Sequence, residues 1–167
     1  MKRTNYTTDE FRKNCKSNST ICFIGAVVLV LIALCGLMIP VYFAINQRGN
    51  WAGSLLGGLE VLTVALGFYF VSKIFRSMSI AGSPFSYDIA DKIMGLSLIL
   101  EIGSTVCFIA AMVIRVTGHG DLIYPSSCGV EPGTFFLLAW AAAYLCTALA
   151  KVFDHGAKLQ KESDETL

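Results

Sequence analysis

Two acidic residues, Glu60 and Glu101, lie inside long apolar stretches of the sequence. A carboxylate near the centre of a bilayer costs at least about 2.5–3.5 kcal/mol, so it needs a neutral form, a partner or a functional reason to be there. No Lys or Arg lies at the same depth in these stretches, and we therefore expect at least one of the two carboxyls to be protonated. Two such acids would suit a proton or cation relay, or a pocket for a polar ligand.

The alternative for both acids is structural, a neutral carboxyl hydrogen-bonded to a nearby hydroxyl. The hydroxyls that could accept this role are those of Ser97, Thr63, Thr105 and Tyr69. Glu60 and Glu101 belong to consecutive stretches that would run antiparallel, so their side chains could face each other. Replacing both acids with Gln would distinguish the alternatives, because an unchanged function and fold would exclude the relay hypothesis.

Other chemistry is sparsely represented. The six cysteines are scattered and form no C-x-x-C pair, which disfavours a thiol oxidoreductase or a zinc site. A solvated turn is the favoured reading for His119, Asp121 and Cys128, ahead of a metal site. The chain contains no G-x-S-x-G, P-loop or H-E-x-x-H motif. We therefore expect no enzyme activity, no metal and no cofactor.

The composition identifies the surroundings in which these residues must work. Of the 167 residues, 54% are hydrophobic and only 15% are charged, with a mean hydropathy of +0.62. This balance excludes a disordered chain and argues against a soluble domain. The net charge of +1 favours no direct binding to nucleic acid. A helix needs about 20 apolar residues to cross a bilayer, and four stretches meet this need, at about 21–45, 53–72, 93–114 and 134–150.

The basic residues predict the orientation of these spans. Eleven of the 13 Lys and Arg residues lie in the two tails or around the middle loop, and only Arg48 and Arg115 lie on the other side. The positive-inside rule then places both termini and the middle loop in the cytoplasm. We predict an all-α, polytopic membrane protein that forms an antiparallel bundle of four transmembrane helices. It would comprise a basic cytoplasmic tail (1–20), the bundle (21–151) and a helical cytoplasmic tail with an acidic end (152–167).

Small residues recur at the spacing of helix contact faces. Close packing replaces the hydrophobic effect between membrane helices, so such residues mark the contacts. We favour packing within one four-helix bundle, and homodimerisation is the alternative. The predicted packing positions are Gly53, Gly57, Gly58, Gly95, Gly103, Ala139 and Ala143.

The two cytoplasmic segments carry further signals. The middle loop has a turn followed by Phe85 and Ser86, where Ser86 is a good N-cap for the third span. The last span is predicted to continue as an amphipathic helix, whose apolar stripe is followed by acidic residues. That stripe comprises Val152, Phe153, Gly156, Leu159 and Gln160, and the acidic end comprises Glu162, Asp164 and Glu165.

These two segments carry a family resemblance. Residues 82–86 (Gly-Ser-Pro-Phe-Ser) resemble the G-x-P-F-[ST] loop of the bacterial membrane family catalogued as domain of unknown function 2975. Residues 152–164 resemble that family's closing V-F-x-x-G-x-x-L-x-x-E-x-D pattern, although members more often have an Arg near His155. The resemblance implies a four-span protein of the bacterial cytoplasmic membrane. It supplies no catalytic residues, and members are often encoded beside a small helix-turn-helix regulator of the Cro/C1 type.

The leading hypothesis is a non-enzymatic sensor or regulator that binds such a transcriptional regulator at its cytoplasmic face. A small transporter or export accessory that uses Glu60 and Glu101 is the second hypothesis, and a structural membrane subunit is the third. An adjoining helix-turn-helix gene would favour the first hypothesis, and an adjoining ATPase or permease gene the second. Besides the lipid bilayer, the predicted partner would contact Gly82, Pro84, Phe85, Ser86, Phe153, Gly156, Leu159, Glu162 and Asp164.

Overall fold

Four long helices form the protein. A computed structural model describes residues 8–46, 51–81, 85–119 and 132–165. Each of the four helices is long and apolar enough to cross a membrane, so the prediction of an all-α protein with four helices able to span a membrane is confirmed. The helices are α1 (Thr8–Asn46), α2 (Trp51–Ala81), α3 (Tyr87–Ile114) and α4 (Pro132–Glu165), and a short π-helix, η1 (Arg115–His119), continues α3.

The helices are longer than the apolar stretches that predicted them. Helix α1 begins at Thr8 instead of near residue 21, with Asp9 and Glu10 in its first turn, where acidic groups favour the helix dipole. Helix α4 continues without a break to Glu165, as predicted for the helical tail. Hydropathy detects only the part of a helix that suits lipid, so the polar ends of α1 and α4 were outside the predicted spans.

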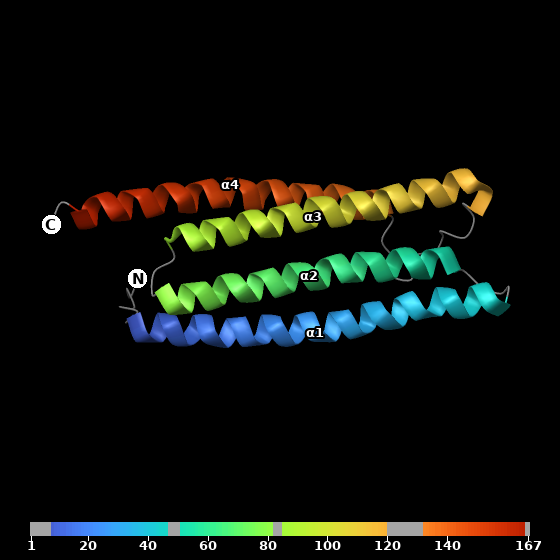
Figure 1. Ribbon diagram of the computed structural model, residues 1–167, viewed down its shortest axis with the longest axis horizontal. Coiled ribbons are helices and arrows are strands. Elements are labelled where there is room, and N and C mark those ends of the chain that lie inside the picture. The colour runs from blue at the N-terminus through green and yellow to red at the C-terminus, as the bar shows by residue number, and fades with distance from the viewer. Residues whose placement is uncertain (1–7, 47–50, 82–84, 120–131, 166–167) are drawn as a thin grey trace, which may run out of the picture.

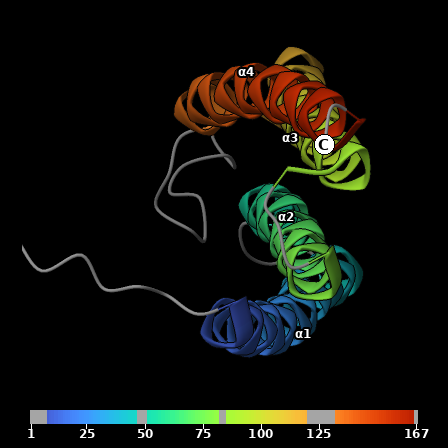
Figure 2. The ribbon, with the colours of Figure 1, turned by 90° about the vertical axis from the view of Figure 1, so that its left-hand side faces the viewer.

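The helices pack in chain order. Helix α1 lies antiparallel beside α2, and α3 beside α4, with both ends of the described chain at the same end of the molecule (Figure 1). The main contacts join α1 to α2, α2 to α3, and α3 to α4. Viewed from the end, the helices follow an open arc with α1 and α4 at its opposite ends (Figure 2). The α2–α3 contact therefore joins the two helix pairs.

Small residues bring the helix backbones together, some at predicted positions and others, such as Gly36, at positions that were not predicted. A Cβ atom on Gly36 would lie 3.4 Å from the Cα atom of Gly58, where α1 meets α2. Gly53 and Gly57 are buried on the same helix as Gly58. Between α3 and α4, the buried alanines of α4 recur at heptad-like intervals, which suits antiparallel helix packing. These alanines are Ala139, Ala143, Ala150 and Ala157.

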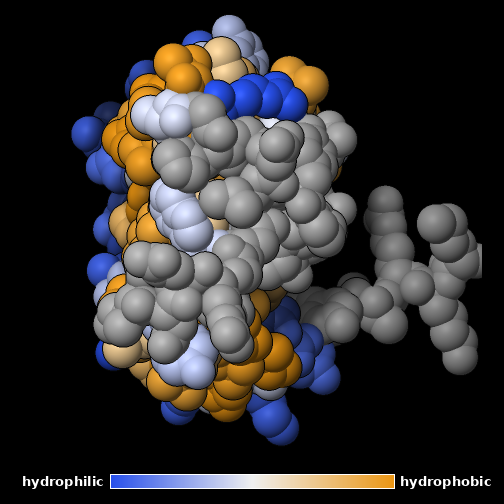
Figure 3. Space-filling model, turned by 90° about the vertical axis from the view of Figure 1, so that its right-hand side faces the viewer, coloured by the Kyte–Doolittle hydropathy of each residue, from blue (hydrophilic) through white to orange (hydrophobic). Residues whose placement is uncertain are grey.

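The outer surface of the helices is strongly apolar. On α1, large side chains such as Ile21 and Leu31 are 64% and 58% exposed, and on α4 Leu137 is 68% exposed. Hydrophobic residues are also prominent around the end of the molecule that faces away from the termini (Figure 3). Water-soluble monomers rarely expose apolar patches larger than a few hundred Å². This continuous surface is suited to contact with lipid tails.

A pair of serines ties α1 to α2. The Ser72 hydroxyl donates to the backbone carbonyl of Ser19 at 2.9 Å, and the Ser19 hydroxyl donates to the carbonyl of Ser72 at 3.0 Å. The two hydroxyl oxygens are 3.2 Å apart. Farther toward the ends, the Ser79 hydroxyl donates to the carbonyl of Arg12 at 3.1 Å. These hydrogen bonds fix the position of α1 along α2, in a contact that is otherwise made by small apolar residues.

Removing one of these hydroxyls should weaken the helix pair. Interhelical hydrogen bonds in membranes contribute about 0.6 kcal/mol on average and at most about 1.7 kcal/mol. We expect Ser72→Ala to lower the free energy of unfolding by an amount in this range, measured by denaturant titration in micelles. Thr20→Ala is the matched control, because the Thr20 hydroxyl donates within its own helix, to the Lys16 carbonyl at 3.1 Å. Equal losses in both variants would contradict a role for the serine pair.

Candidate functional site

Glu60 is buried at the α2–α3 contact. Its residue surface is only 3% exposed, and its Oε1 atom has no hydrogen-bond partner within the described part of the chain. Cys107 of α3, which is 1% exposed, lies within electrostatic reach of this carboxyl and beside Thr63. The site therefore combines a carboxyl, a hydroxyl and a thiol inside the membrane-spanning part of the helices.

The periodicity of α2 turns Glu60 toward α3. The buried positions of the helix include Leu56, Glu60, Thr63 and Gly67, which share one face at a spacing of three or four residues. Apolar clusters lie on either side of the carboxyl along this contact. One contains Ala52, Leu56, Ala111 and Ile114, and the other contains Ile74, Ile89, Ile93, Leu96 and Ala150. Glu60 is thus a polar group between two apolar cores.

Gly103 allows the close approach of α2 and α3 beside this carboxyl. A Cβ atom at this position would lie 2.4 Å from Cγ2 and 2.7 Å from Oγ1 of Thr63. Thr63 is held there because its hydroxyl donates to the Leu59 carbonyl at 3.0 Å. Ser104, the next residue of α3, is fully buried, and its hydroxyl bonds to the Leu100 carbonyl at 2.6 Å. Both hydroxyl protons are therefore used within their own helices.

The structure separates the two acids that the sequence singled out. Glu101 is only partly buried, and it lies six residues from Cys107, which corresponds to about 9 Å along a helix. Within the described residues, no hydrogen bond or ion pair joins Glu60 to Glu101. The two helices meet in a register that places Glu60 beside Cys107 instead. A relay that requires direct contact between the two carboxyls is not supported by this arrangement.

Two of the hydroxyls that could hold a neutral acid, those of Thr63 and Ser97, donate to backbone carbonyls. Ser97 donates to the Ala143 carbonyl of α4 at 2.9 Å, and its oxygen is 2.8 Å from that of Thr147. Tyr69 carries the Lys73 ammonium over its ring, at 4.7 Å from the ring centroid. A neutral carboxyl held by a hydroxyl therefore stays a prediction for Glu60 and Glu101, and Ser97 is turned toward α4 instead.

The middle loop and the C-terminal tail form a second candidate site. The rings of Phe85 and Phe153 have their centroids 5.7 Å apart. A Cβ atom on Gly156 would lie 2.5 Å from Cδ1 of Phe85, so the absence of a side chain at Gly156 makes room for this ring. The two segments that carry the family resemblance, far apart in the sequence, therefore pack together.

The start of α3 is arranged largely as predicted. Ser86 occupies the N-cap position with an extended backbone, but its side chain makes no capping hydrogen bond. Its carbonyl oxygen instead accepts from the backbone N–H groups of Ile89 and Ala90, both at 3.1 Å. Asp88 in the first turn pairs with Lys92 one turn later. Backbone bonding and this ion pair stabilise the helix start, while Ser86 contributes through its backbone conformation.

The tail does not present one apolar stripe. Phe153 and Gly156 contact Phe85, whereas Val152 and Leu159 are 61% and 54% exposed. The buried face follows the heptad-like alanines of α4 instead, which turns the other predicted positions outward. The acidic end is helical through Glu165. Leu159, Glu162 and Glu165 are exposed at the surface, where Glu165 pairs with Lys161 at 3.7 Å.

Some predicted positions fall outside the described residues. They are Gly82 and Pro84 of the loop, the side chain of Asp164, and the metal candidates His119 (side chain), Asp121 and Cys128. Elsewhere in the chain, the described residues contain no group of three or more potential metal ligands.

Sequence reasoning missed the residues of α1 that contact α2. Cys15, Ala26 and Ala33 are buried there, together with the Ser19 hydrogen bonds and the contact at Gly36. Small residues recur along α1 at 19, 26 and 33, and again at 15, 22 and 36 in a second seven-residue series that has Leu at position 29. This heptad repeat was a usable signal for a helix contact.

Comparison with protein-family models, curated proteins and solved structures finds no match to this chain.

Proposed function

We propose that the protein is a non-enzymatic regulator of the bacterial cytoplasmic membrane that binds a small helix-turn-helix transcriptional regulator. Both termini would lie in the cytoplasm, as the distribution of basic residues favours. The observation that carries the proposal is the packing of Phe85 against Phe153 and Gly156. This contact joins the middle loop and the tail into one surface, which can hold a partner outside the membrane.

The exposed groups beside this contact suit a basic partner. Leu159 offers an apolar contact, and Glu162 and Glu165 place negative charge about one and two turns farther along the tail, where Glu165 also pairs with Lys161. DNA-binding regulators carry positive charge for phosphate contacts, and complementary charge speeds and selects association. Holding the regulator at the membrane through these groups would compete with its binding to DNA.

Reversing the tail charges tests this function. We expect E162K/E165K to weaken binding of the purified regulator encoded beside the gene at least about tenfold, which corresponds to about 1.4 kcal/mol. D9K/E10K is the matched control, because it makes the same charge change at the start of α1, away from the tail. The measurement is equilibrium binding in detergent at one ionic strength.

A truncation removes the exposed end of the tail and leaves the loop–tail contact in place. Deleting residues 159–167 leaves Phe153 and Gly156 in place against Phe85, and it should abolish binding. Retained binding by the truncated protein, an equal loss in D9K/E10K, or the absence of any adjoining regulator gene would each count against the proposal.

A second candidate function rests on the unpartnered Oε1 atom of Glu60. A buried carboxyl with free acceptor capacity can bind a proton or a small cation, which is the requirement of an ion-coupled transporter. Its position between two apolar clusters keeps bulk water away from the group. In this candidate, Glu60 acts with the neighbouring Thr63 and Cys107, and Glu101 serves a separate site on α3.

A further inference from the structure

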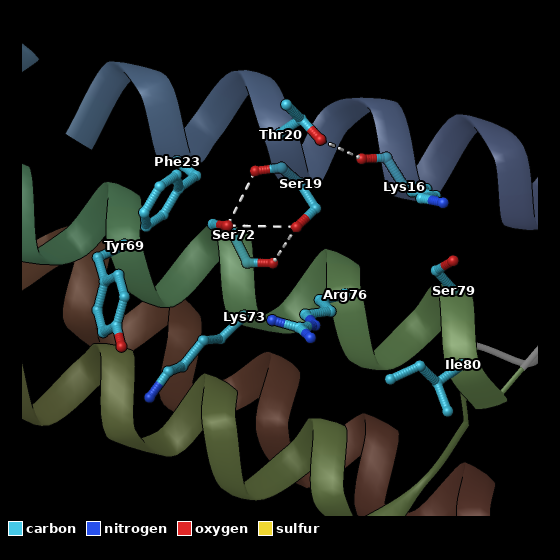
Figure 4. A pocket seen from close by; sticks show the side chains of 10 residues that line it. All are labelled: Lys16, Ser19, Thr20, Phe23, Tyr69, Ser72, Lys73, Arg76, Ser79 and Ile80. Carbon is cyan, nitrogen blue, oxygen red and sulfur yellow. Dashed lines mark hydrogen bonds between the residues drawn. The ribbon is translucent and has the colours of Figure 1, made fainter. Parts of the chain in front are cut away.

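A groove opens between α1 and α2 at the end of the molecule that carries the termini. Its volume is about 660 Å³, and Figure 4 shows Lys16 reaching from α1 and Lys73 and Arg76 from α2. Hydroxyls of Ser19, Thr20 and Ser79 also line the groove, and each donates its proton to a backbone carbonyl. Three cationic side chains therefore line this one helix contact.

The three cations have no acidic partner in the described part of the chain. The ion pairs there join Asp88 to Lys92, Asp154 to Lys158, and Glu165 to Lys161. None of these involves the groove, and the nearest charge contact is that of Lys73 over the Tyr69 ring. Uncompensated positive charge on lysine and arginine favours an anion that has several acceptor oxygens, such as a phosphate.

A second groove continues the first toward the middle of the membrane-spanning part. It has a volume of about 350 Å³ and shares Phe23 and Tyr69 with the basic groove. Its remaining lining is aliphatic and includes Val27, Leu31 and Leu66. The two grooves together form a path that is cationic at one end and apolar at the other.

This path lies at the depth where a lipid headgroup meets its acyl chains. Lys16 precedes the apolar stretch of α1 at residues 21–45, and Lys73 and Arg76 follow that of α2 at 53–72. The apolar groove lies within both stretches. A soluble phosphate compound would use only the cationic end, whereas a phospholipid would use the whole path.

We propose that the α1–α2 grooves bind one anionic phospholipid. Its phosphate lies among Lys16, Lys73 and Arg76, and one acyl chain lies along Phe23, Val27 and Leu66. The Ser19–Ser72 hydrogen bonds hold α1 and α2 in the register that forms the site. The site is independent of the loop–tail surface and of Glu60.

Native mass spectrometry of the detergent-solubilised protein tests this proposal with phosphatidylglycerol and phosphatidylcholine as the probes. We expect the anionic lipid to bind at least tenfold more tightly than the zwitterionic one. K73Q/R76Q should reduce its affinity about 30-fold, because each basic residue at a membrane surface contributes a factor of about five to six. K13Q/K151Q is the matched control with the same loss of charge at the same end, and its affinity should stay within about twofold of the parent.

Three results would overturn the proposal. Equal binding of the two lipids would show that the site does not select an anionic headgroup. An equal loss of affinity in K13Q/K151Q would show that binding depends on the overall positive charge of this end and not on the groove. Displacement by deacylated glycerophosphoglycerol at the same concentration as the intact lipid would identify a soluble phosphate ligand instead. If K73Q/R76Q does not fold, two other variants give the same comparison. R76Q alone should weaken phosphatidylglycerol binding, and the charge-conserving K73R/R76K should retain it.

Discussion

Gly103→Ala is expected to lower the free energy of unfolding by about 1–3 kcal/mol, the range for overpacking a closely packed core. The new methyl group would lie 2.4 Å from Cγ2 of Thr63, and Thr63 is a stiff, β-branched residue that cannot swing away cheaply. Because the α2–α3 contact joins the two helix pairs, the strain falls on the main connection between them. Denaturant or thermal unfolding in micelles is the measurement.

A matched glycine controls for helix propensity. Gly133 lies in the first turn of α4, and a Cβ atom there would meet nothing within 4 Å. We expect Gly133→Ala to be neutral or to stabilise the protein by up to about 1 kcal/mol. Adding Thr63→Ala should recover part of the loss in Gly103→Ala, because it removes the two closest atoms. Loss without such rescue would contradict the proposed contact.

Glu60→Met is expected to raise stability by about 1–3 kcal/mol, the cost of leaving a buried polar group without a hydrogen bond. Glu60 is 3% exposed and its Oε1 atom has no partner among the described residues, while Met is apolar, similar in length and flexible enough to fill the space. Glu101→Met, at a partly buried position, should change stability less. Unfolding in micelles compares the two variants.

Variants of Glu60 also distinguish a structural role of this carboxyl from a role in ion binding. If Glu60 is held for ion binding, Glu60→Gln should abolish proton or cation flux in proteoliposomes while leaving the fold intact, and Glu101→Gln should have a smaller effect. A destabilised Glu60→Met variant would show that the carboxyl has a structural partner. Unchanged flux in Glu60→Gln would remove the transporter candidate.

The composition and local patterns of the sequence were sufficient to predict the class of protein and its elements. Four apolar stretches required four helices, because lipid offers no hydrogen bonds to an unpaired backbone. Glycines and alanines at intervals of three or four residues indicated contact faces, and Gly58, Gly103 and Ala143 do lie at contacts. These properties depend on neighbouring residues along one helix, so they can be read without the rest of the molecule.

The tertiary structure decided which residues of different helices meet. Hydropathy does not specify the rotation of a helix or its register against another, and these placed Glu60 beside Cys107 instead of Glu101. The same freedom turned Ser97 toward α4 and paired Ser19 with Ser72. It also brought Phe85 onto Gly156 across 71 positions of sequence. Sequence therefore determined the helices and their apolar surface, whereas side-chain packing between helices determined the sites, because that packing depends on contacts remote in the chain.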